Sequence, residues 1–261
     1  MSDTGAEGDG TLQVLRKAVE ALNILAEGNE PTTAELATQL GVPRSSLYRL
    51  LRVMEELDLV EPATQRGTYR LGMALLRLGS HVTDTFDLRK LALSQMEALH
   101  DATGETVYLC VRRGMEAVCI ERLAGRRVQT LALSLGGSLP LHVGAASTAL
   151  LAYEPNEFWS EYVSNSALEV PATGDTIDQG QFFDRLEGIR HAGYSVSDGD
   201  VTLGIAAIGA PIFNHRGKVE GALSVAGVRP AIIDLDADGL IAEVRAAAAR
   251  ISRDLGYLAA G

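Results

Sequence analysis

Three arginines lie within residues 41–54, a stretch that carries no acidic residue. Guanidinium groups donate hydrogen bonds to phosphate oxygens and to base edges in the major groove of DNA. The donors of this stretch are Arg44, Ser45, Ser46, Tyr48, Arg49 and Arg52. Two further candidate contacts lie outside it, at Thr33 and at Arg66. These residue types indicate a surface that binds double-stranded DNA.

A helix that presents such donors also needs an apolar inner side. Residues 43–57 have one, formed by Leu47, Leu50, Leu51, Met54 and Leu57 at helical spacing. A short helix over residues 33–40 precedes it, opened by the capping pair Thr32 and Glu35 and stopped by Gly41. This helix, turn, helix order is the one that places a reading helix in the major groove.

Two flanking elements complete the predicted DNA-binding domain. Residues 12–27 predict a helix with one apolar face, made of Leu12, Leu15, Val19, Leu22 and either Leu25 or Ala26. The stretch LVEPATQRGTYRLG predicts a strand, a turn and a strand, with Arg66 at the tip. Three arginines alone would also fit an ordinary solvated surface, but the ordered set favours a winged helix-turn-helix over residues 12–72.

Residues 144–147, Gly-Ala-Ala-Ser, could do a different chemistry. They open a predicted helix, and the free N–H groups at a helix start carry a partial positive charge that suits a carboxylate. Their small side chains would let a ligand approach the backbone. From the residues alone, a tightly packed helix start without a ligand is the simpler interpretation.

Catalytic and metal-binding patterns are missing from the sequence. The histidines lie away from metal-ligand spacing, and no Walker, GxGxxG, GxSxG or HExxH motif occurs. His142, Ser147 and Asp200 have the residue types of a triad, but nothing sets their geometry. Cys110 and Cys119 are expected to be buried free thiols rather than a disulfide. We therefore expect no enzyme, no cofactor and no metal.

The rest of the chain predicts three further segments. Residues 1–11 are small, polar and acidic, which predicts a flexible N-terminus. Residues 73–85 predict a linker helix, whose Leu75, Leu78 and Val82 could pair across a dimer or pack on their own domain. Residues 86–261 mix hairpin strands with helices, which predicts an α+β domain with an antiparallel sheet. Within it we expect a third strand over 127–134 and a loop over 136–141.

The formal net charge of -11 is unusual for a protein that binds DNA. The excess of acid lies outside the predicted DNA-binding part, because residues 12–78 hold as many basic as acidic side chains. An acidic body repels DNA everywhere else and favours one docking pose. Apolar runs are too short to span a bilayer, and the first residues lack a signal-peptide pattern, so we expect a cytoplasmic protein with no membrane partner.

Several stretches resemble one known family. They are TTAELATQLGVPRSSLYRLLRVMEELDLVE with GTYRLG, LPLHVGAASTALLA, IRHAGYSVSDGD and GIAAIGAPIFNHRGKVEGALSVAG. In content and order they are similar to IclR-type bacterial transcriptional regulators, over nearly the whole chain from about residue 12. The resemblance implies a GAF-like effector domain, a homodimer or tetramer, and control of a catabolic operon by a small organic acid.

The resemblance also implies a set of effector contacts. They are Gly144, Ala145, Ala146, Ser197, Asp198, Asp200, Ile205, Ala207, Ser224 and Ala226. The chain departs from the family pattern at residues 147–148, where Gly-Lys is frequent, at 197–200, where an acidic run is frequent, and at Ala226, where a polar residue is common. A less polar pocket than in some relatives is therefore expected, which favours an apolar or aromatic acid.

These features together predict a sequence-specific DNA-binding regulator that acts as a repressor. One winged domain covers few bases, so two heads on a palindromic operator are expected. The alternative is a small-acid sensor or enzyme with an ancillary helix-turn-helix. A third possibility is an interaction module whose arginine face binds an acidic protein.

Overall fold

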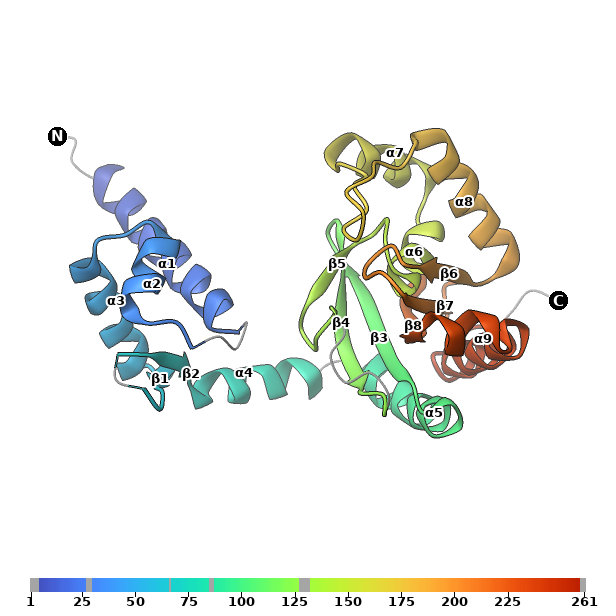
Figure 1. Ribbon diagram of the computed structural model, residues 1–261, viewed down its shortest axis with the longest axis horizontal. Coiled ribbons are helices and arrows are strands. Elements are labelled where there is room, and N and C mark those ends of the chain that lie inside the picture. Colours follow the sequence, from blue (N-terminus) through green and yellow to red (C-terminus); the bar gives the residue numbers. More distant parts are fainter. Residues whose placement is uncertain (1–4, 27–29, 66, 85–86, 127–131, 259–261) are drawn as a thin grey trace. The chain divides into compact units, whose positions relative to one another are not determined.

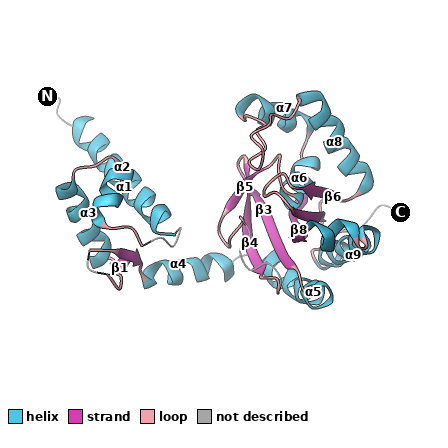
Figure 2. Cartoon of the chain, viewed as in Figure 1, coloured by secondary structure: helices cyan, strands magenta, loops and turns pink. Residues whose placement is uncertain are grey.

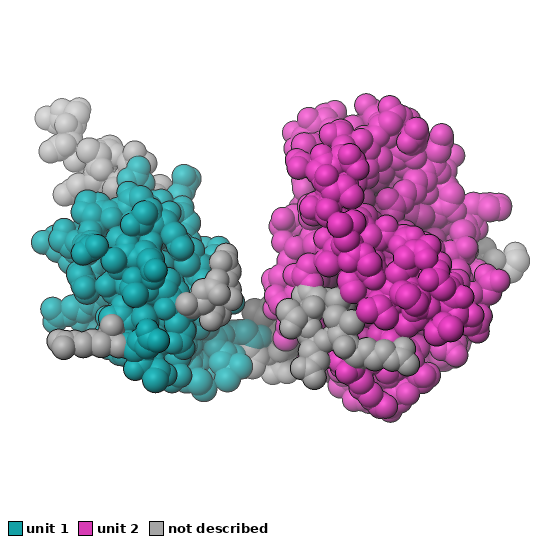
Figure 3. Space-filling view, in the orientation of Figure 1, with its two compact units in different colours: residues 1–85 teal, residues 86–261 magenta. Residues whose placement is uncertain are grey.

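The computed structural model divides the chain into an N-terminal unit, residues 1–85, and a C-terminal unit, residues 86–261 (Figures 1 and 3). The residues that the structure describes are 5–26, 30–65, 67–84, 87–126 and 132–258. Among these, no helix combines the length and apolar character needed to cross a membrane.

Helices dominate the N-terminal unit, which also contains a short hairpin. Its elements are α1 (Gly5–Ala26), α2 (Thr33–Leu40), α3 (Arg44–Glu56), β1 (Val60–Pro62), β2 (Tyr69–Leu71) and α4 (Met73–Asp84). The strands β1 and β2 pair antiparallel, as a wing does. The core gathers side chains from all three first helices, including Leu25, Leu36, Leu40, Leu47 and Leu51.

Capping residues fix both ends of α2. Thr32 accepts a hydrogen bond from the Glu35 N–H, and the Glu35 carboxylate accepts from the Thr32 N–H at 2.8 Å, which is the predicted capping box. Gly41 ends α2 in the left-handed region, at φ 62°, which glycine adopts without strain. Pro43 then precedes α3. The chain therefore turns into α3 within a few residues.

The first helix differs from its prediction in two ways. It begins at Gly5, so residues 5–11, which were predicted to be flexible, are helical. No proline interrupts them, and each residue added to an existing helix gains a backbone hydrogen bond. Leu15 and Val19 were expected to face inward but are 62% and 49% exposed, while Ala21 is buried.

The C-terminal unit is built on a single antiparallel sheet, which confirms the predicted α+β class (Figure 2). Its elements are α5 (Asp87–Thr103), β3 (Thr106–Arg113), β4 (Glu116–Leu123), β5 (Ser138–Pro140), α6 (Ala145–Ala152), α7 (Asn156–Asn165), α8 (Gln179–Ala192), β6 (Ser195–Asp198), β7 (Ile205–Phe213), β8 (Val219–Val228), a π-helical turn (Pro230–Asp234) and α9 (Ala237–Asp254). The strand order is β5-β4-β3-β8-β7-β6.

The segment between β4 and α6 corrects two expectations. The strand predicted over 127–134 lies mostly outside the described residues, and 132–134 are not in a strand. The loop predicted over 136–141 instead contains β5, whose Ser138 pairs with Val118 of β4. An unpaired edge of β4 was available there, and Pro140 is tolerated because β5 is itself an edge strand.

The two faces of the sheet carry different side chains, because successive residues of a strand point to opposite sides. The face covered by α5 and α9, here called the α9 face, includes Val107, Leu109, Ile208, Leu223 and Val225. The face covered by α6, with α7 and α8 packed around that helix, is called the α6 face and includes Tyr108, Cys110, Ala207, Ala222 and Ala226. Both cysteines are buried free thiols.

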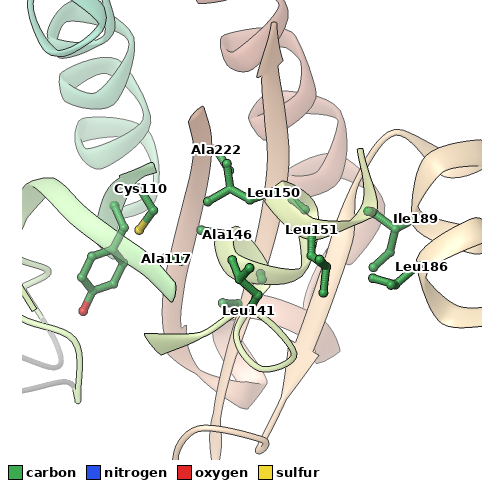
Figure 4. Close-up of a cluster of buried hydrophobic side chains, with 14 of the residues drawn as sticks. Cys110, Ala117, Leu141, Ala146, Leu150, Leu151, Leu186, Ile189 and Ala222 are labelled. Carbon is green, nitrogen blue, oxygen red and sulfur yellow. The ribbon is translucent and has the colours of Figure 1, made fainter. Parts of the chain in front are cut away.

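Helix α6 is enclosed on all sides. All of its residues are buried, which explains why it has no polar face. Figure 4 shows Leu151 near Leu186 and Ile189 of α8, whereas Leu150 lies toward Ala222 of β8. The helix is therefore held between the sheet and α8, and its N-terminal end is fixed relative to the strands.

Candidate functional site

Helix α3 presents a polar, donor-rich side to solvent. Its inner residues Leu47, Leu51 and Met54 are buried in the unit's core. The predicted DNA contacts on this helix are all exposed, namely Arg44, Ser45, Ser46, Tyr48, Arg49 and Arg52. Arg52 bonds Glu56 on the same helix at 3.3 Å, and both side chains are largely exposed. Such a pair is weak and can open to a phosphate.

Two predicted DNA contacts, Thr33 and Arg66, lie outside α3. Thr33 is only 9% exposed, and its hydroxyl lies 3.2 Å from that of Tyr48. Thr33 therefore orients Tyr48 from the start of α2 and is itself shielded from solvent. Arg66 lies outside the described residues.

A cavity of about 60 Å³ lies between the start of α6 and the α6 face of the sheet. The structure brings together there most of the predicted effector contacts: Gly144, Ala145, Ala146, Ser197, Ile205, Ala207, Ser224 and Ala226. The other lining residues are Tyr108, Ala132, Leu133, Leu139, Ser147, Val201, Thr202 and Ala206. Apolar side chains and backbone form most of this lining, and no lysine or arginine is among these residues.

Gly209 of β7 lets α6 approach the sheet closely. A Cβ atom at this position would lie 2.7 Å from the carbonyl carbon of Ala145. The Ser195 hydroxyl donates to the Ala145 carbonyl oxygen at 2.5 Å. These contacts fix the first turn of α6, whose N–H groups at Ala145, Ala146 and Ser147 have no acceptor within the helix.

Asp200 occupies the position just before that turn. Its carboxylate accepts a hydrogen bond from the Gly144 N–H at 3.1 Å and another from the Ser197 hydroxyl. Arg185 of α8 lies 3.6 Å from the same carboxylate. Asp200 was predicted to contact a ligand, but it is not among the lining residues and instead holds the segment after β6 against the start of α6.

Asp198 is placed on the other side of β6. Ser195 and Ser197 are buried while Val196 and Asp198 are exposed, which is the alternation of an edge strand. The Asp198 carboxylate pairs with Arg229 at 3.0 Å. The prediction of Asp198 as a cavity residue is therefore wrong, since a shift of one residue along a strand moves a side chain to the opposite face.

Tyr108 is a cavity residue that the sequence did not reveal. It is 4% exposed, and the guanidinium of Arg122 on β4 lies 5.8 Å from the centre of its ring. Burial raises the pKa of Tyr108 to about 12, so the hydroxyl keeps its proton at neutral pH. The alternation in β3 was readable, but nothing in the sequence showed that β3 lies beside β8.

His142 supports the turn that leads into α6. Its Nδ1 lies 2.7 Å from the Tyr162 hydroxyl, and its Nε2 lies 2.8 Å from the Glu169 carbonyl oxygen. Burial lowers the pKa of His142. Because both ring nitrogens have these partners, the imidazole positions the loop and does not form a triad with Ser147 and Asp200.

Two domain families match the chain. One is the IclR helix-turn-helix domain, over residues 14–63. The other is described as bacterial transcriptional regulator IclR, C-terminal, over residues 80–253. The chain belongs to the IclR family of bacterial transcriptional regulators. This membership confirms the resemblance seen in the sequence.

Individual IclR-family proteins extend the match over most of the chain. The HTH-type transcriptional regulator KipR of Bacillus subtilis (strain 168) is 32% identical, over 92% of this chain and 96% of KipR. The HTH-type transcriptional repressor AllR of Escherichia coli (strain K12) is 28% identical, over 82% of this chain and 80% of AllR. An IclR homologue of Microbacterium hydrocarbonoxydans, solved with 4-hydroxybenzoate, is 25% identical with a TM-score of 0.80, over 94% of this chain and 98% of that chain.

Proposed function

We propose that this IclR-family regulator is a repressor that binds a palindromic operator through α3 and responds to a small organic acid. The observation that carries DNA binding is the exposed donor face of α3, on a helix whose other side is buried. A related protein, AllR, is named as a repressor, which supports the sign of regulation. The target proposed here is a catabolic operon, and the proposal includes no catalytic step.

The proposed assembly is a homodimer or a pair of dimers. Large apolar side chains of the N-terminal unit remain in solvent, namely Val14, Leu15 and Val19 of α1 and Leu76 and Leu78 of α4. Their exposed fractions, from 49% to 64%, are those of side chains that a partner surface would cover. A second copy would bring a second α3 to the matching half-site of a palindrome.

The proposed effector site is the cavity at the start of α6. The first-turn N–H groups supply donors and partial positive charge for a carboxylate, and the remaining lining is mainly apolar. A relative solved with 4-hydroxybenzoate supports a carboxylic acid, including an aromatic one, as the ligand class. Such an acid controls the regulator by binding one of its conformations more tightly than the other.

A gel mobility-shift assay on the DNA upstream of the chain's own gene tests the proposal. Wild-type protein should retard the fragment, and Arg49→Ala should weaken binding by about 10- to 100-fold, the effect of losing one base contact. Arg216→Ala, at an exposed position in the turn between β7 and β8, removes the same charge from the other unit and should change little.

Several outcomes separate this proposal from its alternatives. No retarded band at low salt would contradict DNA binding. Acid binding without a band would favour a small-acid sensor. Equal weakening by Arg49→Ala and Arg216→Ala would indicate a general charge effect rather than a contact by α3.

A further inference from the structure

The cavity at the start of α6 is small for the acids proposed to bind in it. Its volume is about 60 Å³. An apolar cavity of roughly 150 Å³ is the size that takes up one benzene molecule in a protein interior. Benzoate and 4-hydroxybenzoate are larger than benzene, so part of the lining has to move before either of them fits.

The β6–β7 loop, residues 199–204, forms one wall of this cavity, because two of its residues belong to the lining. Across the base of the loop, the Gly199 N–H donates to the Ile205 carbonyl oxygen at 2.9 Å. Within the described part of the chain, the N–H groups of residues 201–203 bond to no acceptor. The middle of the loop is therefore held mainly by its side chains.

Val201 of this loop covers the start of α6. Its Cγ2 atom would lie 3.5 Å from a Cβ placed on Gly144, the residue before the first helical turn. Val201 also lines the cavity, together with Thr202. Leu203 follows and is 69% exposed, so the other side of the loop faces solvent. In this conformation the loop closes over the helix start at which the acid is proposed to bind.

One side chain fastens the loop in this position. The Asp200 carboxylate accepts hydrogen bonds from the Gly144 N–H at 3.1 Å and from the Ser197 hydroxyl. Among the described residues, no other side chain of the loop makes a hydrogen bond or an ion pair. The closed conformation of the loop therefore depends on a carboxylate at the start of α6.

An acid ligand would bring a second carboxylate to the same place. Its proposed donors are the N–H groups of the first turn of α6, which directly follows Gly144. Two carboxylates at one helix start repel each other, and the repulsion is stronger away from bulk water. Arg185 of α8 lies 3.6 Å from the Asp200 carboxylate and is 32% exposed, so Asp200 has a partner to keep when it leaves Gly144.

We propose that Asp200 is a latch, which keeps the cavity closed in the free protein until the carboxylate of the effector displaces it from Gly144. Release of the latch lets the β6–β7 loop move outward, and the cavity then has room for an aromatic acid. This inference rests on the proposed effector site and adds the regulation of its opening. Asp200 is then a positioning residue that opposes binding, not a contact of the ligand.

Isothermal titration calorimetry with benzoate and 4-hydroxybenzoate tests the latch. Asp200→Asn keeps the size of the side chain and removes its charge, so the loop should open more readily and both acids should bind roughly 10-fold more tightly. Asp198→Asn is the matched control. It removes the same charge two residues away, at an exposed position of β6, and should leave the affinity within about 3-fold of the wild type.

A label on the loop gives a measurement that needs no ligand. Both native cysteines are buried, so Leu203→Cys offers one exposed thiol for an environment-sensitive dye. Benzoate should change the emission of this label in the chain that keeps Asp200. Adding Asp200→Asn should change the emission in the same direction without any acid. A label at Arg216→Cys, an exposed position in the turn between β7 and β8, should respond to neither.

The possible outcomes distinguish the two proposals. If neither acid binds the wild-type chain or Asp200→Asn, the proposed effector site is wrong, and the label still decides whether Asp200 holds the loop. If Asp200→Asn weakens acid binding, Asp200 contacts the acid and the latch is wrong. Equal tightening by Asp200→Asn and Asp198→Asn would indicate a general charge effect. A label on the loop that responds neither to benzoate nor to Asp200→Asn would show that the loop does not open.

Discussion

The two faces of the C-terminal sheet come from the same strands but have different contents. On the α9 face, Leu109, Ile208 and Leu223 pack against α5 and α9 and are fully buried. On the α6 face, the alternate positions of the same strands hold smaller residues, including Ala207, Gly209, Ala222, Ser224 and Ala226. Branched side chains fill the first layer, whereas small ones leave a cavity beneath α6 in the second.

This difference separates stability from binding within one sheet. The branched strand residues of the α9 face contribute more folding free energy than the small strand residues of the α6 face, because each large apolar side chain removes more area from water. The small residues on the α6 face contribute less, but they allow a helix start to come close and leave volume for a ligand. Substitutions on the α9 face should therefore mainly lower the free energy of unfolding, whereas substitutions on the α6 face should mainly lower the affinity for the acid.

The largest effect is expected from Leu223→Ala on the α9 face. Leu223 is fully buried among large neighbours, so its truncation should lower the free energy of unfolding by ~2–5 kcal/mol. Urea unfolding followed by the fluorescence of Trp159, the chain's single tryptophan, measures this. Ser224→Ala, the next residue on β8, points into the cavity and should cost under ~1 kcal/mol. Equal losses of unfolding free energy in Leu223→Ala and Ser224→Ala would show that the two faces contribute equally to stability.

Gly209→Ala should cost less stability but more binding. Its new Cβ would meet the Ala145 backbone at 2.7 Å, so α6 has to shift, at a cost of ~1–3 kcal/mol. Acid binding measured by calorimetry should be lost, because the first turn of α6 moves. Gly188→Ala is the control: nothing lies within 4 Å of its new Cβ in α8, and it should gain ~0.5–1 kcal/mol. If Gly209→Ala still binds the acid, the acid site does not depend on the position of the first turn of α6.

The sequence predicted the elements that depend on local signals. The capping pair Thr32 and Glu35, the turn at Gly41 and the apolar spacing of α3 are all local, and the structure has them where they were expected. The prediction for the first helix was wrong where packing is not local: Leu15 fits an inward stripe, but the described part of its unit leaves it 62% exposed.

The cavity was predictable only in part. The family pattern pointed to Ala207 and Ser224, which do line it. Tyr108 was missed because it joins the cavity through the pairing of β3 with β8, two strands that are more than a hundred residues apart in sequence. The prediction for Asp198 was wrong because alternate residues of β6 point to opposite faces of the sheet. Which residues of β6 point to the cavity depends on the register of its pairing with β7.

A larger side chain in the cavity tests whether acid binding needs the cavity's volume. Ala226→Leu should remove acid binding in calorimetry while changing the free energy of unfolding by under ~1.5 kcal/mol, because there is space for the larger side chain. Ala92→Leu makes the same change in the filled layer, where α5 meets the α9 face, and should cost ~1–3 kcal/mol. If Ala226→Leu is as destabilising as Ala92→Leu, the cavity is no more tolerant than the core.

The smallest effect expected is a difference in the response to acid. The cluster on the α9 face is apolar, whereas the layer around α6 contains the buried imidazole of His142, with Tyr162, Asp200 and Arg185 near it. Burial lowers the pKa of His142 below the usual 6.5, so the folded chain binds this proton less readily than the unfolded chain. Its contribution to stability is therefore complete above pH 6.5 and is lost as the pH falls through the folded pKa.

Urea unfolding between pH 8 and pH 5, roughly the range over which a histidine titrates, measures this contribution. His142→Gln should unfold more easily at pH 8, since it loses the hydrogen bonds to Tyr162 and Glu169, but its stability should fall less than that of the wild type as the pH is lowered. His191→Gln, at an exposed position on α8, should keep the wild-type slope. A wild-type slope in His142→Gln would place the acid sensitivity elsewhere, and the layer around α6 would then respond to pH no differently from the α9 face.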